Sequence, residues 1–266
     1  MNVCVLISCM HQPLHNHDII QRTNVQTNCV VINQCDYECI EHIGFLNKKG
    51  IRCEAIFIYT KERGLSRSRN MAIKNANGDI CLICDDDEYL YDNYSDIILD
   101  GYNQISEADL LTYDINGCST PDDLASFRKL SLKNILQTSS VQITFRRESC
   151  LSHNVSFDED MGSGSGNGAG EENKFLMDFR RHKLNIYHVN TEIGMLIENS
   201  DSQWFNGYNP KYFENHGWAS RRILGSYLSL AYILYTVIFK YSIYKKDISM
   251  FRVAKSELIG WIKKHN

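Results

Sequence analysis

Three features are missing from the sequence, and each absence argues against a class of protein. No signal peptide precedes the first apolar stretch, because Met1 and Asn2 lead directly into it. The uncharged stretch at residues 223–239 has 17 residues, fewer than the roughly 20 needed to span a bilayer. The glycine-rich stretch at residues 162–170 lacks the Lys-Ser or Lys-Thr of a P-loop. We therefore expect neither a secreted protein, nor a membrane-spanning protein, nor a P-loop nucleotidase.

Cysteine is plentiful, with ten residues in a chain of 266. Without a signal peptide we expect these thiols to be reduced and buried in a cytoplasmic protein. Cys81 and Cys84 have the spacing of a redox or zinc motif, but residues three apart in a strand face opposite sides. We expect no site there. The length and an apolar content of 43% suffice for one large core.

Short apolar stretches alternate with helical or loop segments along the chain. The expected strands are residues 2–9, 29–34, 53–59, 80–84, 110–115, 141–146 and 185–189. This alternation predicts an α/β fold, with a mostly parallel central sheet flanked by helices and joined by right-handed crossovers.

Four acidic residues, at positions 85–88, follow the apolar strand expected at residues 80–84. Carboxylates crowded at the carboxyl end of a buried strand repel one another unless a cation lies among them. Ligands of open α/β sheets bind at this edge. The leading interpretation is a divalent metal that holds a phosphorylated substrate, and a solvated acidic turn is the alternative.

A helix is expected immediately before this strand. Ser66 is predicted to cap its beginning and Gly78 to end it. The helix would bring Arg69 near the acidic edge, where a guanidinium group pairs well with phosphate oxygens.

The sequence from this helix to the acids resembles the family 2 glycosyltransferases of the GT-A fold. Residues 64–70 read Gly-Leu-Ser-Arg-Ser-Arg-Asn, followed by Gly-Asp at 78–79 and three aspartates at 85–87. The family signature has alanine where Ser68 stands and aspartate where Glu88 stands. The resemblance covers about residues 1–220. It implies an inverting transfer from a nucleotide-diphosphate sugar, expected to be a UDP-sugar. The acceptor would be a glycan or lipid-linked molecule, in bacterial surface-polysaccharide synthesis.

The same resemblance implies roles for individual residues. Glu172, with Glu171 next in line, matches the base that deprotonates the acceptor hydroxyl, and Asp87 would bind Mn²⁺ or Mg²⁺. The helix dipole also favours acids in a first turn, so a structural role for the two glutamates is the alternative. Asn33-Gln34 replaces a pair that is often acidic, which leaves the identity of the base open. The expected nucleotide-sugar-binding residues are Ser8, Cys9, Asn33, Gln34, Asp36, Arg69, Asp85 and Asp86.

Basic residues are concentrated in residues 221–266, which carry nine Lys or Arg and two acids in a chain whose net charge is −4. They flank the uncharged stretch, which argues against nucleic acid and predicts a helix lying on an anionic membrane. A second helix is expected near residues 251–262, with Phe251 and Leu258 on its apolar face. We expect a catalytic domain at residues 1–220 with a helical tail, placed peripherally on the inner face of the cell membrane. Alternatively, the tail covers the core of the domain.

Two further clusters and two rival functions stay open. His11, His15 and His17 could bind zinc, line the donor site or be exposed. Aromatic residues at positions 204–218 could form an acceptor platform or pack in the core. A sugar-phosphate nucleotidyltransferase would need a glycine-rich basic loop after its first strand, and residues 9–17 contain neither glycine nor Lys or Arg. A non-catalytic nucleotide- or glycan-binding protein of the same fold is the second rival.

Overall fold

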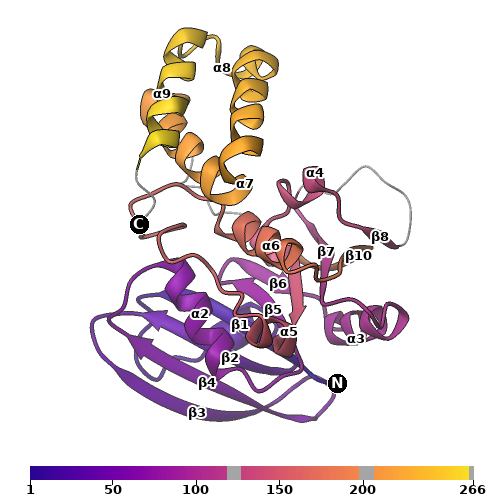
Figure 1. Ribbon diagram of the computed structural model, residues 1–266. Helices are drawn as coiled ribbons and strands as arrows, with labels where there is room; N and C mark the ends of the chain where they lie inside the picture. Colours follow the sequence, from indigo (N-terminus) through magenta and orange to yellow (C-terminus); the bar gives the residue numbers. More distant parts are fainter. Residues whose placement is uncertain (119–126, 198–206, 264–266) are drawn as a thin grey trace.

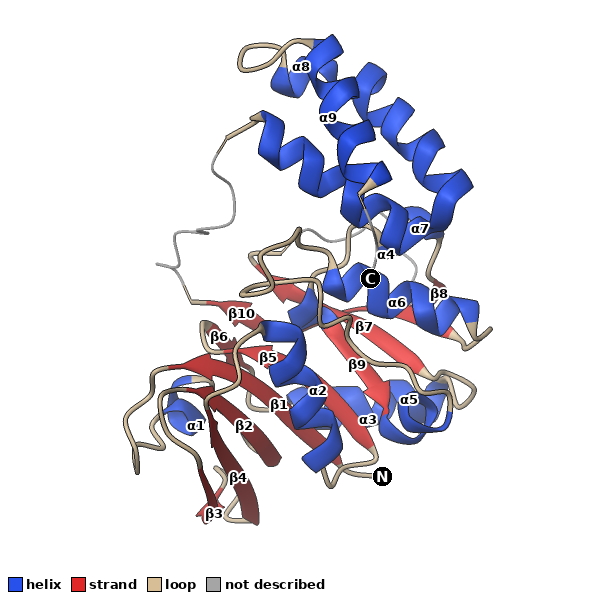
Figure 2. Ribbon diagram, turned by 60° about the vertical axis from the view of Figure 1, so that its left-hand side comes forward, coloured by secondary structure: helices blue, strands red, loops and turns tan. Residues whose placement is uncertain are grey.

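A mixed sheet forms the centre of the protein in the computed structural model, which describes residues 1–118, 127–197 and 207–263 (Figures 1 and 2). Within these residues the strand order is β3-β4-β2-β1-β5-β9-β7-β10-β6, and β8 pairs with β10. The strands are β1 Val3–Met10, β2 Asn28–Gln34, β3 Cys39–Leu46, β4 Arg52–Thr60, β5 Ile80–Asp85, β6 Glu88–Leu90, β7 Leu110–Asn116, β8 Phe127–Lys129, β9 Ile143–Arg146 and β10 Ile186–Leu196.

Helices cover both faces of this sheet (Figure 2). They are α1 Ile19–Arg22, α2 Leu65–Asn75, α3 Tyr94–Gln104, α4 Leu132–Ile135, α5 Arg147–Ser152, α6 Glu171–Arg181, α7 Pro210–Phe239, α8 Tyr241–Tyr244 and α9 Met250–Ile262, with a 3₁₀ turn at Ser140–Gln142. The predicted α/β class, with a central sheet between helices and a helical extension at the C-terminal end, is confirmed.

The parallel part of the sheet comprises β4, β2, β1 and β5, which are four of the predicted strands. Beyond β5 the sheet is mixed, because β9 runs antiparallel to both β5 and β7. The sequence did not predict β3, β6 or β8. The edge strand β3 alternates half-buried with exposed residues and pairs antiparallel with β4.

Two apolar cores lie on the two faces of the sheet. One core joins the strands to α1 and α3, and the other joins them to α2, α5, α6 and the first half of α7. Cys81 and Cys84 belong to different cores, so the expectation that they face opposite sides is confirmed.

The expected ends of α2 need correction. Gly64, with φ of 123°, precedes the helix in a conformation that suits glycine, and Ser66 does not cap it. The Ser66 hydroxyl instead donates a hydrogen bond of 2.9 Å to the carbonyl of Met161. The helix ends at Asn75, before Gly78. Gly78 is needed for close approach, because a Cβ there would lie 2.6 Å from the Cβ of Cys4.

The tail and the first part of α7 together form a helical hairpin that rises beside α6 (Figure 1). The backbone of α7 leaves helical geometry at Gly225, so its two halves diverge. Within the described chain, α7 is the one helix that is long and apolar enough to cross a membrane, although buried helices of soluble proteins pass the same test. Its length exceeds the predicted apolar stretch because the helix already begins at Pro210.

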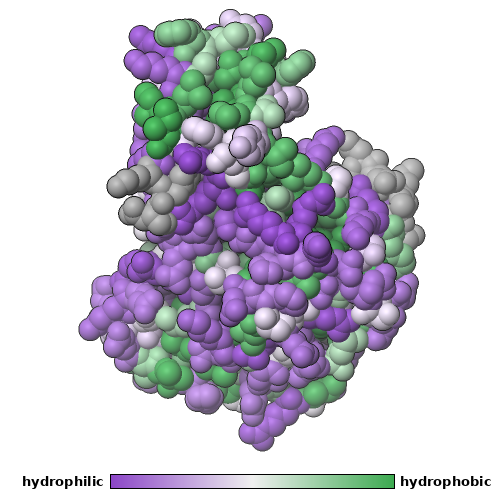
Figure 3. All heavy atoms as spheres, in the orientation of Figure 1, coloured by the Kyte–Doolittle hydropathy of each residue, from purple (hydrophilic) through white to green (hydrophobic). Residues whose placement is uncertain are grey.

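Large apolar side chains are exposed on the tail, where Figure 3 shows them gathered over the upper helices. The second helix, α9, buries Val253, Ser256, Glu257 and Gly260, and leaves Phe251 80% exposed. The face predicted to be apolar is therefore turned outward. We call the exposed set the apolar tail surface; it comprises Tyr227, Leu228, Leu234, Tyr235, Ile238, Phe239, Phe251, Leu258, Ile259 and Ile262.

Candidate active site

The carboxyl edge of the parallel strands brings several predicted residues together. Strand register places Ser8 of β1 directly beside Asp85 of β5, and Cys9 beside Asn33 of β2. Ser8 is 7% exposed, and its hydroxyl has no hydrogen-bond partner among the described residues. A buried hydroxyl without a partner at a strand end is suited to hydrogen-bond a ligand there.

Arg69 connects this edge to the start of α6. Its side chain is 1% exposed, and its Nη1 lies 3.1 Å from Oε1 of Glu171. Its Nη2 lies 3.1 Å from Oδ1 of Asp85 and donates a 2.9 Å hydrogen bond to the Ser140 hydroxyl. Burial would lower the pKa of Arg69, but the charges of Asp85 and Glu171 outweigh it and raise the pKa. The guanidinium group therefore remains charged and holds two carboxylates from distant segments in one place.

Glu171 and Glu172, the two candidates for the base, are the first residues of α6. Gly170 precedes them with φ of 107°. Gly162 lies against the Glu171 carboxyl group, since a Cβ at residue 162 would lie 2.9 Å from Cδ of Glu171. Glu172 is half-buried. Burial, together with the charge of Glu171, raises the pKa of Glu172 to about 8. A carboxylate with such a pKa is a stronger base than an ordinary glutamate.

The glycine-rich loop holds these glutamates against α2. The amide of Leu65 donates a 2.9 Å hydrogen bond to the carbonyl of Ser163, next to the contact between Ser66 and Met161. Residues 162–170 are therefore part of the structure around Glu171 and Glu172. They pack against α2 and the first turn of α6 and do not lie free on the surface.

The acidic cluster after β5 divides into accessible and buried members. Asp85, Asp86 and Asp87 are half-buried, and burial, with the charges of Asp87 and Asp85, raises the pKa of Asp86. Glu88 is fully buried in β6, and neither of its carboxyl oxygens has a hydrogen-bond partner among the described residues. Burial and the nearby charge of Asp85 raise its pKa well above the usual value. The expectation of four acids around a cation is thus wrong for Glu88, because β6 turns it into the core.

The carboxylates at the end of β5 fit a divalent cation that is shared with a substrate. Within the described residues, no three His, Cys, Asp or Glu side chains form a ready-made metal site. Mg²⁺ is commonly held by one or two carboxylates, with water and substrate phosphates completing the coordination. Burial is the largest cause of the raised pKa of Asp86, and the charges of Asp87 and Asp85 add to it; a bound cation would offset this second contribution.

The predicted residues at the end of β2 make contacts with the protein itself. Asn33 bonds both the amide and the carbonyl of Gln12, at 3.1 and 2.8 Å. Gln34 accepts a 2.8 Å hydrogen bond from the amide of Gly64. Asp36 is exposed and pairs with Arg63 at 2.7 Å. Roles in binding the base stay predictions for these residues, and their observed contacts shape the loops around the site.

Cys9 is buried, and burial raises the pKa of its thiol to about 12. Its Sγ is directed to the carbonyl of Ile32, at 3.6 Å. A thiol with this pKa is not ionised near neutral pH. Cys9 therefore presents no reactive thiolate near neutral pH, and its role in binding the nucleotide sugar stays a prediction.

Two of the three histidines contact one acid. Nδ1 of His15 lies 2.5 Å from Oε1 of Glu41, and Nε2 of His17 lies 2.7 Å from Oε2. Glu41 comes from β3, a strand that the sequence did not predict. Among the predicted aromatic residues, Trp204 and Phe205 lie outside the described residues.

Ser140 is the member of this site that sequence reasoning missed. It hydrogen-bonds Arg69 and lies 3.4 Å from Oδ2 of Asp85. It belongs to the short turn before β9, 55 residues from Asp85 in the chain. No local motif marks it, so only the fold reveals its contact.

Comparisons with known proteins agree with this geometry. The sequence profile of Glycosyl transferase family 2 matches residues 27–161. A search among curated proteins gave no significant match.

Solved structures with a similar fold include TarS from S. aureus. TarS 1–349 in complex with UDP-GlcNAc matches with a TM-score of 0.59 and 17% identity, over 93% of this chain and 74% of that one. The same fragment in complex with UDP has a TM-score of 0.56 and 15% identity, with the same coverage. At such identities the likeness shows the fold, and the predicted GT-A fold is confirmed.

Proposed function

Since the chain belongs to glycosyl transferase family 2, we propose that it transfers a sugar from a UDP-sugar to an acceptor hydroxyl with inversion of configuration. The observation that carries this proposal is the bridge made by Arg69, which joins Asp85 at the strand edge to Glu171 beside the expected base. In this proposal one buried side chain would fix the distance between the donor site and the base.

In this proposal Glu172 removes the proton from the acceptor hydroxyl while the oxygen attacks the anomeric carbon. The bond from that carbon to the diphosphate oxygen breaks in the same step, and the nucleoside diphosphate leaves. A positioned general base contributes roughly 10²–10⁴-fold to such a rate. Glu171 pairs with Arg69. Burial raises the pKa of Glu172, and the charge of Glu171 adds to this rise.

Ser8 and Asp85 would contact the nucleotide at the strand ends, and Asp86 would lie beside them. Asp87 would hold Mn²⁺ or Mg²⁺, which when bound supplies Lewis-acid stabilisation of the departing diphosphate. The tight packing of acids after β5 supports this part of the proposal.

The acceptor that we propose is a glycan or a lipid-linked molecule in the synthesis of a cell-surface polysaccharide. The support is the apolar tail surface, which lies next to the exposed lysines 240, 245 and 246. Such a combination suits an anionic membrane surface. Residues 1–220 would then form the catalytic domain and residues 221–266 its membrane-facing tail, on the inner face of the cell membrane.

Thermal unfolding in the presence of nucleoside diphosphates tests the donor site. We expect UDP with Mn²⁺ to raise the unfolding midpoint by several degrees, and Asp87→Ala to abolish this rise together with UDP-sugar hydrolysis. Asp96→Ala is the matched control, because Asp96 is exposed and pairs only with Lys49 among the described residues. If UDP leaves the midpoint unchanged, or if Asp87→Ala behaves like Asp96→Ala, the proposed donor site is wrong.

A further inference from the structure

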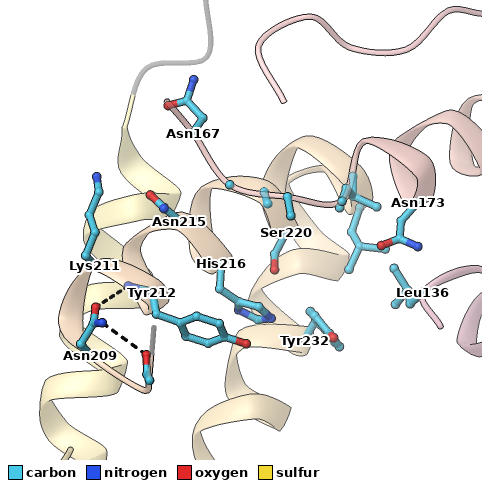
Figure 4. Close-up of a pocket in the computed structure, with 17 residues that line it drawn as sticks. Leu136, Asn167, Asn173, Asn209, Lys211, Tyr212, Asn215, His216, Ser220 and Tyr232 are labelled. Carbon is cyan, nitrogen blue, oxygen red and sulfur yellow. Dashed lines mark hydrogen bonds between the residues drawn. The ribbon is translucent and has the colours of Figure 1, made fainter. Parts of the chain in front are cut away.

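A cavity of about 370 Å³ lies between the glycine-rich loop and α7. Pockets of roughly 300–1,000 Å³ are typical for small molecules. Gly170 and Asn173, on either side of the two glutamates in sequence, line one wall, and Tyr212, His216 and Tyr232 of α7 line the opposite wall (Figure 4). The cavity therefore reaches the chain at Gly170, two residues before the proposed base in sequence.

Three rings of α7 follow one another along this cavity. The ring centroids of Tyr212 and His216 are 6.4 Å apart with planes nearly parallel, and those of His216 and Tyr232 are 5.4 Å apart. Figure 4 shows the Tyr212 ring directed toward the side of the cavity where His216 and Tyr232 lie. Tyrosine and histidine rings combine an apolar face with a hydroxyl group or a ring nitrogen. They suit a ligand that has both C–H faces and hydroxyl groups.

His216 is held in place by a carboxylate from a different helix. Its Nδ1 lies 2.7 Å from Oε1 of Glu257 in α9, and the Glu257 side chain is 0% exposed. The second oxygen, Oε2, has no hydrogen-bond partner among the described residues. A buried carboxylate bonded to one ring nitrogen fixes the ring orientation and leaves Nε2 for a further partner.

The polarity of the cavity favours an uncharged ligand. Lys211 is the one Lys, Arg, Asp or Glu among the described lining residues, and its side chain is 61% exposed. Asn215 and Ser220 provide neutral hydrogen-bonding groups on the same helix. This composition favours the hydroxyl groups of a sugar over a phosphate.

We propose that this cavity binds a neutral sugar unit of the acceptor, with the ring of Tyr212 against its C–H face and a hydrogen bond between a sugar hydroxyl and His216, which Glu257 orients. The inference rests on the proposed function, because a sugar bound here is an acceptor only if Glu172 is the base. It assigns to α7, and through Glu257 to α9, a direct part in choosing the acceptor.

Saturation-transfer NMR on the full chain tests this site. The probes are the methyl glycosides of glucose, galactose and N-acetylglucosamine, each at millimolar concentration and with UDP and Mn²⁺ present. We expect at least one probe to bind, and Tyr212→Ala and His216→Gln to raise its Kd roughly tenfold. Glu257→Gln, which keeps shape but weakens the hold on His216, should raise it about threefold.

Leu230→Ala is the control, since Leu230 is an exposed residue of the same helix and does not line the cavity. UDP binding reports whether each variant is folded. Tyr232→Phe is a milder cavity variant than Tyr212→Ala, because it removes only a hydroxyl group. The proposal is overturned if no probe binds to the unaltered protein, or if the cavity variants bind as the control does. Should UDP bind and the sugars not bind, only this inference fails. Sugar binding without UDP binding would reject the donor proposal instead.

Discussion

At the scale of single residues, Arg69 lies at the acidic edge, as its motif predicted. Its expected contact with the nucleotide sugar stays a prediction, and the structure adds contacts within the protein. In the structure its two terminal nitrogens bond Asp85, Glu171 and Ser140 inside the protein. Only a planar, forked side chain can reach several oxygens at once, which explains why arginine stands here rather than lysine.

Replacing Arg69 with lysine should therefore impair both stability and transfer. A lysine keeps the charge but cannot bridge Asp85 and Glu171, so we expect a loss of about 1–3 kcal/mol in the free energy of unfolding. We also expect transfer to fall at least tenfold. Urea denaturation and a transfer assay measure the two effects. Arg67→Lys, at a half-exposed position of the same helix, should change neither; equal behaviour of the two variants would contradict the bridging role.

The raised pKa of Glu172 predicts the pH dependence of transfer. The carboxyl group must be ionised to act as a base, so kcat/KM should rise about tenfold per pH unit and level off above about pH 8. The charge of Glu171 contributes to the shift, so Glu171→Gln should move this rise to lower pH. Glu172→Gln should lower the rate roughly 10²–10⁴-fold while UDP still binds.

The two variants also decide which glutamate is the base. If Glu171→Gln abolishes transfer and Glu172→Gln only shifts the profile, the assignment is reversed.

The raised pKa of Glu172 also predicts how the stability of the protein depends on pH. Because the folded protein holds a proton on Glu172 that the unfolded chain loses above its ordinary carboxyl pKa, the free energy of unfolding should decrease as pH rises toward 8.

Sequence reasoning found the residues that lie in recognisable motifs. Arg69, Asp85 and Glu171 were all named, and the structure places them in direct contact. Ser140 and the pair of His216 with Glu257 were not found, because their partners are 41 or more residues away and no short pattern records such contacts.

At the scale of elements, glycines set how closely α7 and α9 cross. A Cβ at Gly217 would lie 2.1 Å from the carbonyl oxygen of Glu257, and one at Gly260 would lie 1.8 Å from that of Glu214. Both neighbours are backbone atoms, which cannot move aside as a flexible side chain can. This crossing brings Glu257 within reach of His216.

Gly217→Ala and Gly260→Ala should therefore destabilise the protein, although alanine normally favours a helix by about 1 kcal/mol. We expect the free energy of unfolding to fall by about 1–3 kcal/mol for each variant, because α7 and α9 must separate to admit the added methyl group. Denaturant titration measures this free energy. Ala231→Gly, at an exposed position of α7, gives the ordinary helix propensity difference for comparison. Stabilisation by either alanine would show that the helices are not in close contact.

The elements that the sequence predicted share a strong local signal. The central strands are continuous apolar stretches, buried on both sides, and are therefore easy to recognise. The missed strands β6 and β8 have three residues each and exist only because β10 pairs with them. The ends of α2 were misjudged since Ser66 and Gly78 serve contacts with the loop and with β1.

At the scale of the whole molecule, the apolar tail surface predicts binding to membranes. The full chain should sediment with vesicles that contain anionic lipid, and more weakly at high salt, because the lysines are screened. Phe251→Ser combined with Ile262→Ser should reduce the bound fraction severalfold. Each buried side chain of this kind contributes on the order of 1.5–3 kcal/mol.

Exposed apolar residues of the edge strand β3 provide the control for this experiment. Ile40→Ser combined with Leu46→Ser removes similar exposed groups outside the tail, and we expect no change in vesicle binding. The membrane assignment is wrong if the unaltered chain stays in the supernatant, or if both pairs of substitutions weaken binding equally.

The overall plan of the molecule was within reach of the sequence, because one signature joins a helix, a strand and its acids in a fixed order. The mixed half of the sheet was not, since strand direction beyond β5 depends on how β9 inserts between β5 and β7. The outward direction of the apolar face of α9 also follows from packing, which chooses Val253 and Gly260 for the contact.

The cavity beside α6 has walls from two sources, the glycine-rich loop and the helix α7. Exchange of residues 207–263 between relatives would therefore transplant half of that wall and leave the strand ends unaltered. Under the proposal made above, such hybrids would use the recipient molecule of one parent and the activated sugar of the other. The hairpin would then be the segment to exchange when a different recipient is wanted.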